Sequence, residues 1–305
     1  MRTEKRDILG LRDMSVADIT EILETAKSMK KLLNSGIKRS PHLQGKTIVC
    51  LFYEDSTRTR LSFELASKYM SANQANITAG GSSVSKGETL IDTARTIDMM
   101  AADVIVIRHP MSGAPHLLAR HVGASVVNAG DGMHEHPTQG LLDMFTIIEK
   151  KGRLEGLRVA IAGDVLHSRV ARSNIWGLQK MGANVCVAGP PTMLPRDIES
   201  TGAEVFDTVH EAITGADVVM GLRLQLERQQ LGLFPNVREY SKYFGIDQNK
   251  LRLAKQDVLV MHPGPVNRGV EMTSEVIDAA YSAINEQVTN GLAVRMSILY
   301  TLVKR

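Results

Sequence analysis

Short apolar runs alternate with longer segments of helical spacing along most of this chain, and this alternation limits the folds open to it. The candidate strands are Thr47–Tyr53, Ala75–Thr78, Val104–Ile107, Ser125–Asn128, Arg158–Ala162, Asn184–Ala188, Asp217–Leu222 and Val258–Met261. The candidate helices are a segment after Ser15, then Arg60–Met70, Thr89–Met100, Ala114–His121, Gln139–Lys150, Arg169–Met181, Ser274–Ala283 and Gly291–Val303. Strands connected through helices form parallel sheets, so the pattern predicts an α/β protein.

The length of the chain indicates more than one domain. Its 305 residues exceed the roughly 250–300 residues at which a single hydrophobic core stops growing. A polar gap at residues 150–156 separates the first four strands from the others. We therefore expect two doubly wound parallel-sheet domains joined by bridging helices, with the active site in the cleft between the domains.

Composition excludes several classes of protein. A hydrophobic fraction of 43% and a charged fraction of 23% are ordinary globular values. A net charge of +3 and 4% aromatic residues do not favour nucleic-acid binding, and no apolar run approaches the ~20 residues of a membrane span. The N-terminus shows no secretory signal, and Cys50 and Cys186 lie in apolar runs typical of buried, reduced thiols. These features predict a soluble, cytoplasmic protein.

Polar side chains follow six of the predicted strands, at the ends where parallel sheets bind ligands. The segments are Glu54–Arg60, Arg108–Pro110, Gly130–Gln139, Gly163–Arg169, Gly221–Gln225 and His262–Pro265. Because they are rich in Arg, His, Gln and hydroxyl residues, they predict a cleft lined with hydrogen-bond donors, and hence an anionic ligand.

The segment Ser56–Arg60 is the strongest candidate for a phosphate site, because it joins a strand to a helix start and carries three hydroxyls and two arginines. The alternative is an N-capping turn with a solvated arginine. Gly45-Lys46-Thr47 precedes a strand and lacks the earlier glycine of a P-loop. No Gly-x-Gly-x-x-Gly follows a strand, which argues against a dinucleotide cofactor.

Two further segments each allow two interpretations. His134-Glu135-His136 could bind a metal, but no Cys or carboxylate cluster completes a site, so we expect one histidine to act as a donor in the cleft and no metal or cofactor. The polar loop Gly80–Glu88 is either a mobile surface loop or a lid that brings Lys86 to an anion.

Five motifs in order resemble those of the aspartate/ornithine carbamoyltransferase family, over nearly the whole chain. They are Phe52-x-Glu54-x-Ser56-Thr57-Arg58-Thr59, Ser85-Lys86-Gly87-Glu88-Thr89, His136-Pro137-Thr138-Gln139, Arg223-x-Gln225-x-Glu227-Arg228 and His262-Pro263-Gly264-Pro265. Glu54, the Lys86 loop and the Arg223 loop are similar to the branch that acts on aspartate.

The resemblance implies transfer of the carbamoyl group of carbamoyl phosphate to the amine of L-aspartate, which gives N-carbamoyl-L-aspartate and phosphate. This is the committed step of pyrimidine synthesis, and it needs no cofactor. Catalysis would consist of positioning and oxyanion stabilisation. The alternatives are another amino-acid acceptor, such as ornithine, or a paralogue that has lost its activity.

The resemblance also assigns roles to individual residues. Those expected to bind carbamoyl phosphate are Ser56, Thr57, Arg58, Thr59, Arg108, His136, Gln139, Gly264 and Pro265, and Arg58, Thr59, Arg108 and His136 would be catalytic. Those expected to bind aspartate are Lys86, Arg169, Arg223 and Gln225, with Arg172 as the competitor of Arg169.

The family resemblance implies a homotrimer in which Ser82 and Lys86 reach the active site of the neighbouring subunit. A regulatory chain or a dihydroorotase-like partner could join a higher assembly. The carbamoyl-phosphate domain would comprise residues 1–137 and 287–305, and the aspartate domain residues 138–286.

Overall fold

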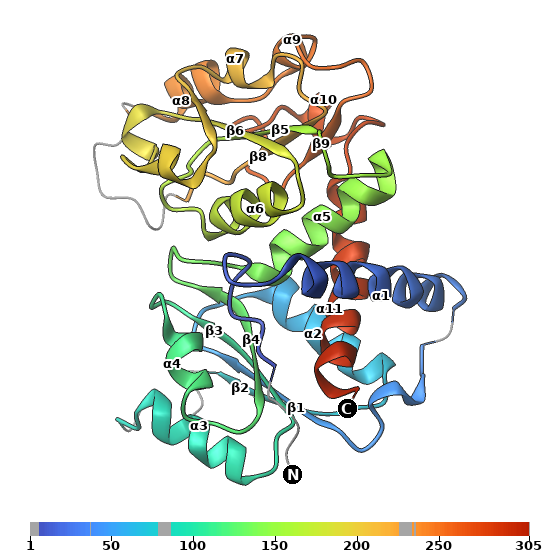
Figure 1. The fold of residues 1–305 in the computed structure, drawn as a ribbon. Helices are drawn as coiled ribbons and strands as arrows, with labels where there is room; N and C mark the ends of the chain where they lie inside the picture. Colours follow the sequence, from blue (N-terminus) through green and yellow to red (C-terminus); the bar gives the residue numbers. More distant parts are fainter. Residues whose placement is uncertain (1–5, 37, 79–86, 226–233, 235, 305) are drawn as a thin grey trace. The chain divides into compact units, whose positions relative to one another are not determined.

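The computed structural model describes residues 6–36, 38–78, 87–225, 234 and 236–304. The chain divides into two compact units, Met1–Leu141 with Thr289–Arg305, and Leu142–Val288 (Figure 1). Both divisions fall inside helices, α5 (Pro137–Lys151) and α11 (Ile284–Val303), so these two helices join the units. The binding role expected for each unit stays a prediction.

The first unit is built on a four-stranded parallel sheet of order β2-β1-β3-β4. Its strands are β1 (Thr47–Phe52), β2 (Asn73–Thr78), β3 (Val104–His109) and β4 (Ser125–Asp131). Helices α3 (Leu90–Met99) and α4 (Ala114–Ala119) cover one face, and α1 (Val16–Asn34), α2 (Thr57–Tyr69) and α11 cover the other (Figure 1). Alternate strand residues such as Val49, Leu51 and Ile105 pack toward α3 and α4, as the two-residue period of a strand requires.

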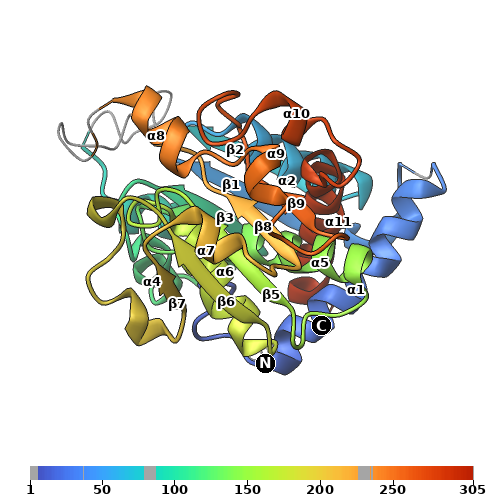
Figure 2. The same cartoon turned by 90° about the horizontal axis from the view of Figure 1, so that it is seen from above.

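The second unit is built on a five-stranded parallel sheet of order β7-β6-β5-β8-β9. Its strands are β5 (Arg158–Ala162), β6 (Asn184–Ala188), β7 (Glu204–Phe206), β8 (Val218–Gly221) and β9 (Leu259–Met261). Helix α6 (Arg169–Lys180) lies on one face and α7 (Val209–Ile213) on the other, as Figures 1 and 2 both show. The expected class, an α/β protein with two parallel-sheet domains, is confirmed.

Each sheet reverses its strand order once, and this reversal locates the binding edge. In the first sheet the chain leaves β1 for β2 on one side and returns to β3 on the other, so the connections after β1 and β3 diverge. In the second sheet the connections after β5 and β8 diverge in the same way. Ligands of doubly wound sheets bind at such a switch point, beyond the carboxyl ends of the strands.

The second unit holds most of the differences from the sequence-based prediction. The predicted helix Ser274–Ala283 is wrong beyond α10 (Ser274–Ile277), because Tyr281 and Ala283 form backbone hydrogen bonds with Val260 of β9. Strand β7 and the short helices α7, α8 (Val237–Phe244) and α9 (Gln248–Leu251) were not predicted. Segments of three to eight residues carry too few turns or alternations to produce a periodic signal.

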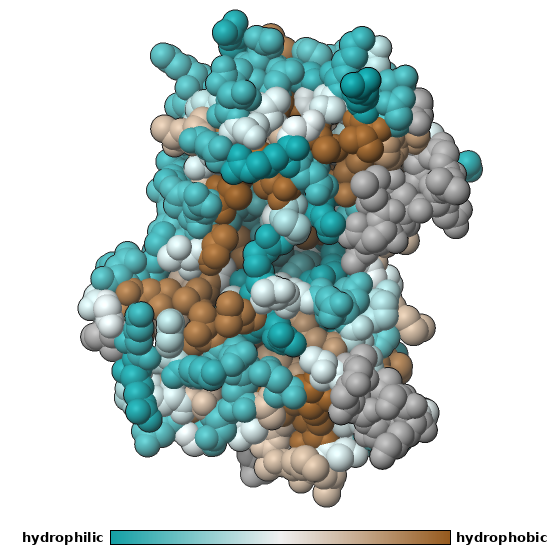
Figure 3. Space-filling view, turned by 180° about the vertical axis from the view of Figure 1, so that it is seen from behind, coloured by the Kyte–Doolittle hydropathy of each residue, from teal (hydrophilic) through white to brown (hydrophobic). Residues whose placement is uncertain are grey.

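The described helices include none that is both long enough and apolar enough to span a membrane. On the face that Figure 3 shows, hydrophilic side chains cover the top of the second unit. The cysteines predicted to be buried, Cys50 and Cys186, are buried free thiols.

Candidate active site

The first group of predicted residues lies at the switch point between β1 and β3. Ser56, Thr57, Arg58 and Thr59 form the start of α2, directly after β1. Arg108 is next to the last residue of β3 and pairs with Phe52 of β1 in the sheet register. The fold therefore places a hydroxyl-rich helix start and an arginine on neighbouring strand ends.

The N-terminus of α2 is arranged differently from a capped helix. Ser56 occupies the N-cap position in extended conformation, but its side chain makes no capping hydrogen bond. The first turn contains no acidic residue. The N–H groups of a first turn and the positive end of the helix dipole attract an anion. This geometry disfavours the alternative interpretation of the segment as an N-capping turn.

Arg108 is fixed by two contacts on either side of its strand. Its Nε lies 3.3 Å from Oε2 of Glu54, and its Nη1 donates to the carbonyl oxygen of Ala129 at 3.3 Å. Both charged side chains are largely shielded from solvent. A guanidinium held in this way keeps its planar donors in one orientation, which suits recognition of phosphate or a developing oxyanion.

His136 is a buried side chain at the start of α5. Its Nδ1 lies 3.4 Å from the hydroxyl of Thr138, and Gln139, also buried, follows one residue later. When the Thr138 hydroxyl donates to Nδ1, the ring carries its proton on Nε2 and donates from there. That tautomer suits the predicted role of donor to a carbonyl oxygen.

The side chains of the three residues in the His-Glu-His motif contact different parts of the structure. The Glu135 carboxylate accepts hydrogen bonds from the N–H groups of Leu11 and Arg12. A Cβ atom at Gly10 would lie 2.3 Å from that carboxylate, so only glycine allows the approach. His134 contacts Asp131 through Nδ1 instead, and the motif therefore does not form one metal site.

Asp131 fixes the turn that leads to His136. Its carboxylate accepts hydrogen bonds from the N–H groups of Gly113 and Glu135 and from the side chain of Asn128. Burial acts to raise the pKa of Asp131, but the hydrogen bonds from His134, Gly113 and Asn128 outweigh burial and lower it. Asp131 is therefore an anion at neutral pH, and it orders this turn.

In the second unit, the predicted aspartate-binding residues lie at the switch point between β5 and β8. Arg169 is the first residue of α6, and its side chain is buried. Arg223 and Gln225 follow β8. The Gln225 side chain donates to the carbonyl oxygen of His167 at 3.3 Å. This hydrogen bond joins the connection after β8 to the connection after β5.

The competitor of Arg169 is engaged elsewhere. The Arg172 guanidinium donates to the carbonyl oxygen of Leu166 at 3.5 Å, within the connection that precedes α6. The His167 ring is held by Asp164, with Nδ1 2.8 Å from the carboxylate. These contacts order the connection that carries Arg169, and the role of Arg169 stays a prediction.

The loop His262–Pro265 is held by a chain of buried hydrogen bonds. His262 Nδ1 accepts from the N–H of Gly264 at 2.8 Å, and the N–H of His262 donates to the side chain of Gln287 at 2.9 Å. Gln287 donates in turn to Asp143 at 2.8 Å. The other oxygen of Asp143 accepts from Asn174 of α6 at 2.8 Å. The buried Asp143 carboxylate thus connects α5, α6, α11 and the loop that carries Gly264 and Pro265.

Sequence reasoning missed Asp143, Asn174 and Gln287. All three lie in helices with no motif around them, and only their complete burial distinguishes them from surface polar residues. A polar residue at an apolar position of a helix was the available signal. Ser82 and Lys86, predicted for the neighbouring subunit's site, lie outside the described residues.

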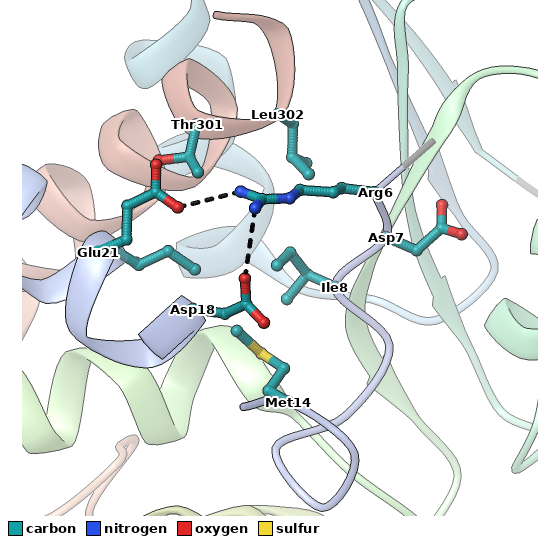
Figure 4. A pocket seen from close by; sticks show the side chains of 9 residues that line it. Arg6, Asp7, Ile8, Met14, Asp18, Glu21, Thr301 and Leu302 are labelled. Atoms are coloured by element: carbon teal, nitrogen blue, oxygen red, sulfur yellow. Dashed lines mark hydrogen bonds and ion pairs between the residues drawn. The ribbon is translucent and has the colours of Figure 1, made fainter. Parts of the chain in front are cut away.

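A cavity of about 110 Å³ lies in the first unit, near the N-terminal segment (Figure 4). Its lining residues include none of the predicted site residues. Arg6 points into the cavity and pairs with Glu21 at 3.0 Å and with Asp18 at 3.7 Å. These contacts tie the N-terminal segment to α1, which is a structural role.

Two parallel-sheet units, each with basic and amide side chains at its switch point, define a class of two-domain α/β proteins that bind small anionic ligands. Residues 6–149 match the carbamoyl-P binding domain of aspartate/ornithine carbamoyltransferases, and residues 155–302 match their Asp/Orn binding domain. The chain belongs to the aspartate/ornithine carbamoyltransferase family.

Similar proteins cover the chain from end to end. It is 68% identical over 305 residues to the aspartate carbamoyltransferase catalytic subunit of Acetivibrio thermocellus, which covers 100% of this chain and 98% of that protein. The corresponding subunit of Ruminiclostridium cellulolyticum is 66% identical, with coverage of 100% and 97%.

Solved structures share the fold in both branches of the family. Aspartate transcarbamoylase from Trypanosoma cruzi, in complex with carbamoyl aspartate and phosphate, has a TM-score of 0.87 and 32% identity over 98% of this chain and 96% of that one. Ornithine carbamoyltransferase from Pyrococcus furiosus has a TM-score of 0.86 and 32% identity over 97% and 96%. The fold alone therefore does not distinguish the two acceptors.

Proposed function

We propose that this chain transfers the carbamoyl group of carbamoyl phosphate to the amine of L-aspartate, and so produces N-carbamoyl-L-aspartate and phosphate. The observation that carries the proposal is the uncapped, hydroxyl-rich start of α2 beside Arg108, which suits a phosphate group. The choice of aspartate rests on the high identity to aspartate carbamoyltransferase catalytic subunits along the whole chain.

In this proposal the reaction proceeds without a covalent intermediate. Arg58 and the hydroxyls of α2 bind the phosphate, and Thr59, Arg108 and His136 donate to the carbamoyl oxygen. As the amine attacks the carbamoyl carbon, negative charge grows on that oxygen, and fixed donors stabilise it. The bond from carbon to the phosphate oxygen then breaks, and phosphate leaves with the electron pair and accepts the proton that the amine nitrogen loses.

The remaining predicted residues orient the two substrates. Gln139 and the carbonyl oxygens of Gly264 and Pro265 hold the carbamoyl amino group, since that group can only donate. Arg169, Arg223 and Gln225 bind the aspartate carboxylates, because two negative charges need cationic and amide partners. Correct mutual orientation lowers the barrier by itself.

The acceptor is tested by product analysis. Incubation with carbamoyl phosphate and L-aspartate is expected to give carbamoylaspartate and one phosphate per turnover, and L-ornithine is expected to give no citrulline. Citrulline as the main product would favour the ornithine alternative. Phosphate release that does not depend on either amino acid would contradict transfer altogether.

We also propose a cytoplasmic homotrimer with active sites shared between subunits. In it, Ser82 and Lys86 reach into the active site of the neighbouring subunit. Met99 and Met100, at the end of α3, are exposed at 85% and 74% in the single chain, which suits a surface covered by another subunit. The product is used in pyrimidine synthesis. The relatives are named catalytic subunits, which is compatible with a regulatory or dihydroorotase-like partner.

A further inference from the structure

His116, Asp131 and His134 bring three potential metal ligands together in the first unit, apart from the predicted substrate residues. Their ligand atoms all lie within 4.8 Å of one another. His116 belongs to α4, Asp131 ends β4, and His134 lies in the turn before α5. The cluster therefore depends on tertiary structure: of the motif His134-Glu135-His136 it uses His134 alone, and His116 comes from a separate helix.

The separations between the donor atoms suit a bound cation. His134 Nδ1 lies 3.0 Å from Oδ2 of Asp131 and 3.3 Å from Oδ1. Two ligands about 2.0–2.1 Å from one ion, at tetrahedral or octahedral angles, are separated by about 2.9–3.4 Å. The His116 and His134 rings meet at 67° with centroids 5.3 Å apart, so the two imidazoles are direct neighbours, and the ligand atoms of all three residues lie within 4.8 Å of one another.

The carboxylate is fixed by contacts that would support a ligand. Asp131 accepts from the N–H of Gly113 at 2.7 Å and from the Asn128 side chain at 2.8 Å. The N–H of Glu135 adds a third contact at 3.1 Å. Hydrogen bonds of this kind hold a metal-binding carboxylate in place.

The state of His116 is the second observation that points to a ligand. Its Nδ1 is shielded from solvent and has no hydrogen-bond partner among the described residues. Shielded polar atoms of native proteins are nearly always satisfied. A cation bound at this cluster would give the His116 ring a partner, and the side chain of His134 is exposed enough (36%) to let an ion enter.

We propose that His116, Asp131 and His134 form a binding site for a divalent transition-metal ion of the zinc and cobalt class. Two neutral imidazoles and one carboxylate are ligands that such ions prefer, whereas magnesium and calcium prefer oxygen ligands alone. Water would complete the coordination. The site is structural: it would join α4 to the turn that leads to His136.

The test titrates Zn²⁺ and Co²⁺ into metal-free protein by calorimetry, with visible absorption to follow Co²⁺. The variants are His116→Gln and His134→Gln. His121→Gln is the matched control, because the His121 ring, which follows α4, contacts the carbonyl oxygen of Leu117 and does not belong to the cluster. The wild type and the control are expected to bind one ion per chain, and each ligand variant at least tenfold more weakly.

The shift in Tm that Zn²⁺ produces gives a second readout, which stays valid if a variant is less stable without metal. Zn²⁺ should raise the Tm of the wild type and of His121→Gln, but not that of His116→Gln or His134→Gln. Three results would overturn the proposal: no binding at millimolar Zn²⁺, binding that neither ligand variant weakens, or equal weakening in all three histidine variants.

Discussion

At the scale of single residues, Arg108 is a charged side chain that two neighbouring groups hold in one orientation. Glu54 contacts its Nε and the Ala129 carbonyl oxygen contacts its Nη1, so the guanidinium is already oriented on its strand. Fixed donors need no reorganisation as charge develops, and this makes them effective in catalysis. Arg58, on the neighbouring helix start, is exposed toward solvent in the same region.

Replacing Arg58 tests the phosphate site at α2. Arg58→Ala is expected to lower kcat/KM by about 10²–10³-fold, the usual effect of removing a donor to a transition-state charge. Steady-state kinetics with both substrates varied measures the change. Arg60→Ala is the matched control, since Arg60 is an exposed arginine on the same helix. Equal losses in the two variants would contradict a specific role for Arg58.

The two cysteines give a prediction about pH. Burial raises the pKa of Cys50 to about 12 and that of Cys186 to about 11, from a usual value of 9.0. Folding therefore favours the neutral thiols, and this contribution to stability is complete below pH 9 and lost as pH rises toward 11–12.

Alkylation kinetics check the cysteine prediction. Neither thiol should react with iodoacetamide in the folded protein at pH 8, and both should react once urea unfolds it. Rapid labelling of the native enzyme at pH 8 would show that the thiols are accessible. Mass spectrometry of the peptides that contain Cys50 and Cys186 identifies the site.

At the scale of elements, the buried Asp143 carboxylate connects separate parts of the second unit. It receives the amide groups of Asn174 in α6 and Gln287 in α11, and Gln287 continues to the loop at His262. The two helices thus share one acceptor, and the loop is connected to it through Gln287. A change at Asp143 therefore reaches Gly264 and Pro265 without any direct contact.

We expect Asp143→Asn to disturb this arrangement, because an amide has one acceptor oxygen for two donors and leaves one buried donor unsatisfied. The free energy of unfolding should fall by about 1–3 kcal/mol, measured by urea denaturation. The KM for carbamoyl phosphate should rise more than the KM for aspartate. Asp257→Asn, which removes an exposed partner of Lys151, is the control. Unchanged kinetics in Asp143→Asn would show that the loop keeps its position without the network.

Sequence predicted the long elements well and the short ones poorly. The strand Arg158–Ala162 is found as expected, since a run of buried β-branched and small residues leaves little alternative. The segment after Ile277 was predicted as helix, but its backbone pairs with β9 instead. Such pairing depends on residues far away in the chain, and local periodicity does not report it.

At the scale of the whole molecule, the proposal that subunits share active sites predicts how mixed assemblies behave. Arg58→Ala and Lys86→Ala subunits should each be nearly inactive alone. Mixed trimers, however, contain sites that combine an intact Arg58 with an intact Lys86 from a neighbour, so mixing after dissociation should restore activity. Activity no greater than the sum of the separate variants would show that each subunit completes its own site.

The sequence by itself determined the parallel α/β class, the polar strand ends and the family, because these depend on local periodicity and on motifs that stay together along the chain. Tertiary structure alone decided which side chains meet. His134, Glu135 and His136 are adjacent in sequence, yet their side chains have different partners. His134 contacts Asp131, Glu135 accepts from the N–H of Leu11, and His136 contacts Thr138. Asp143, Asn174 and Gln287 are far apart in sequence and share one buried network. The physical reason is that buried polar groups must find partners wherever the fold brings them, and chain distance does not limit that choice.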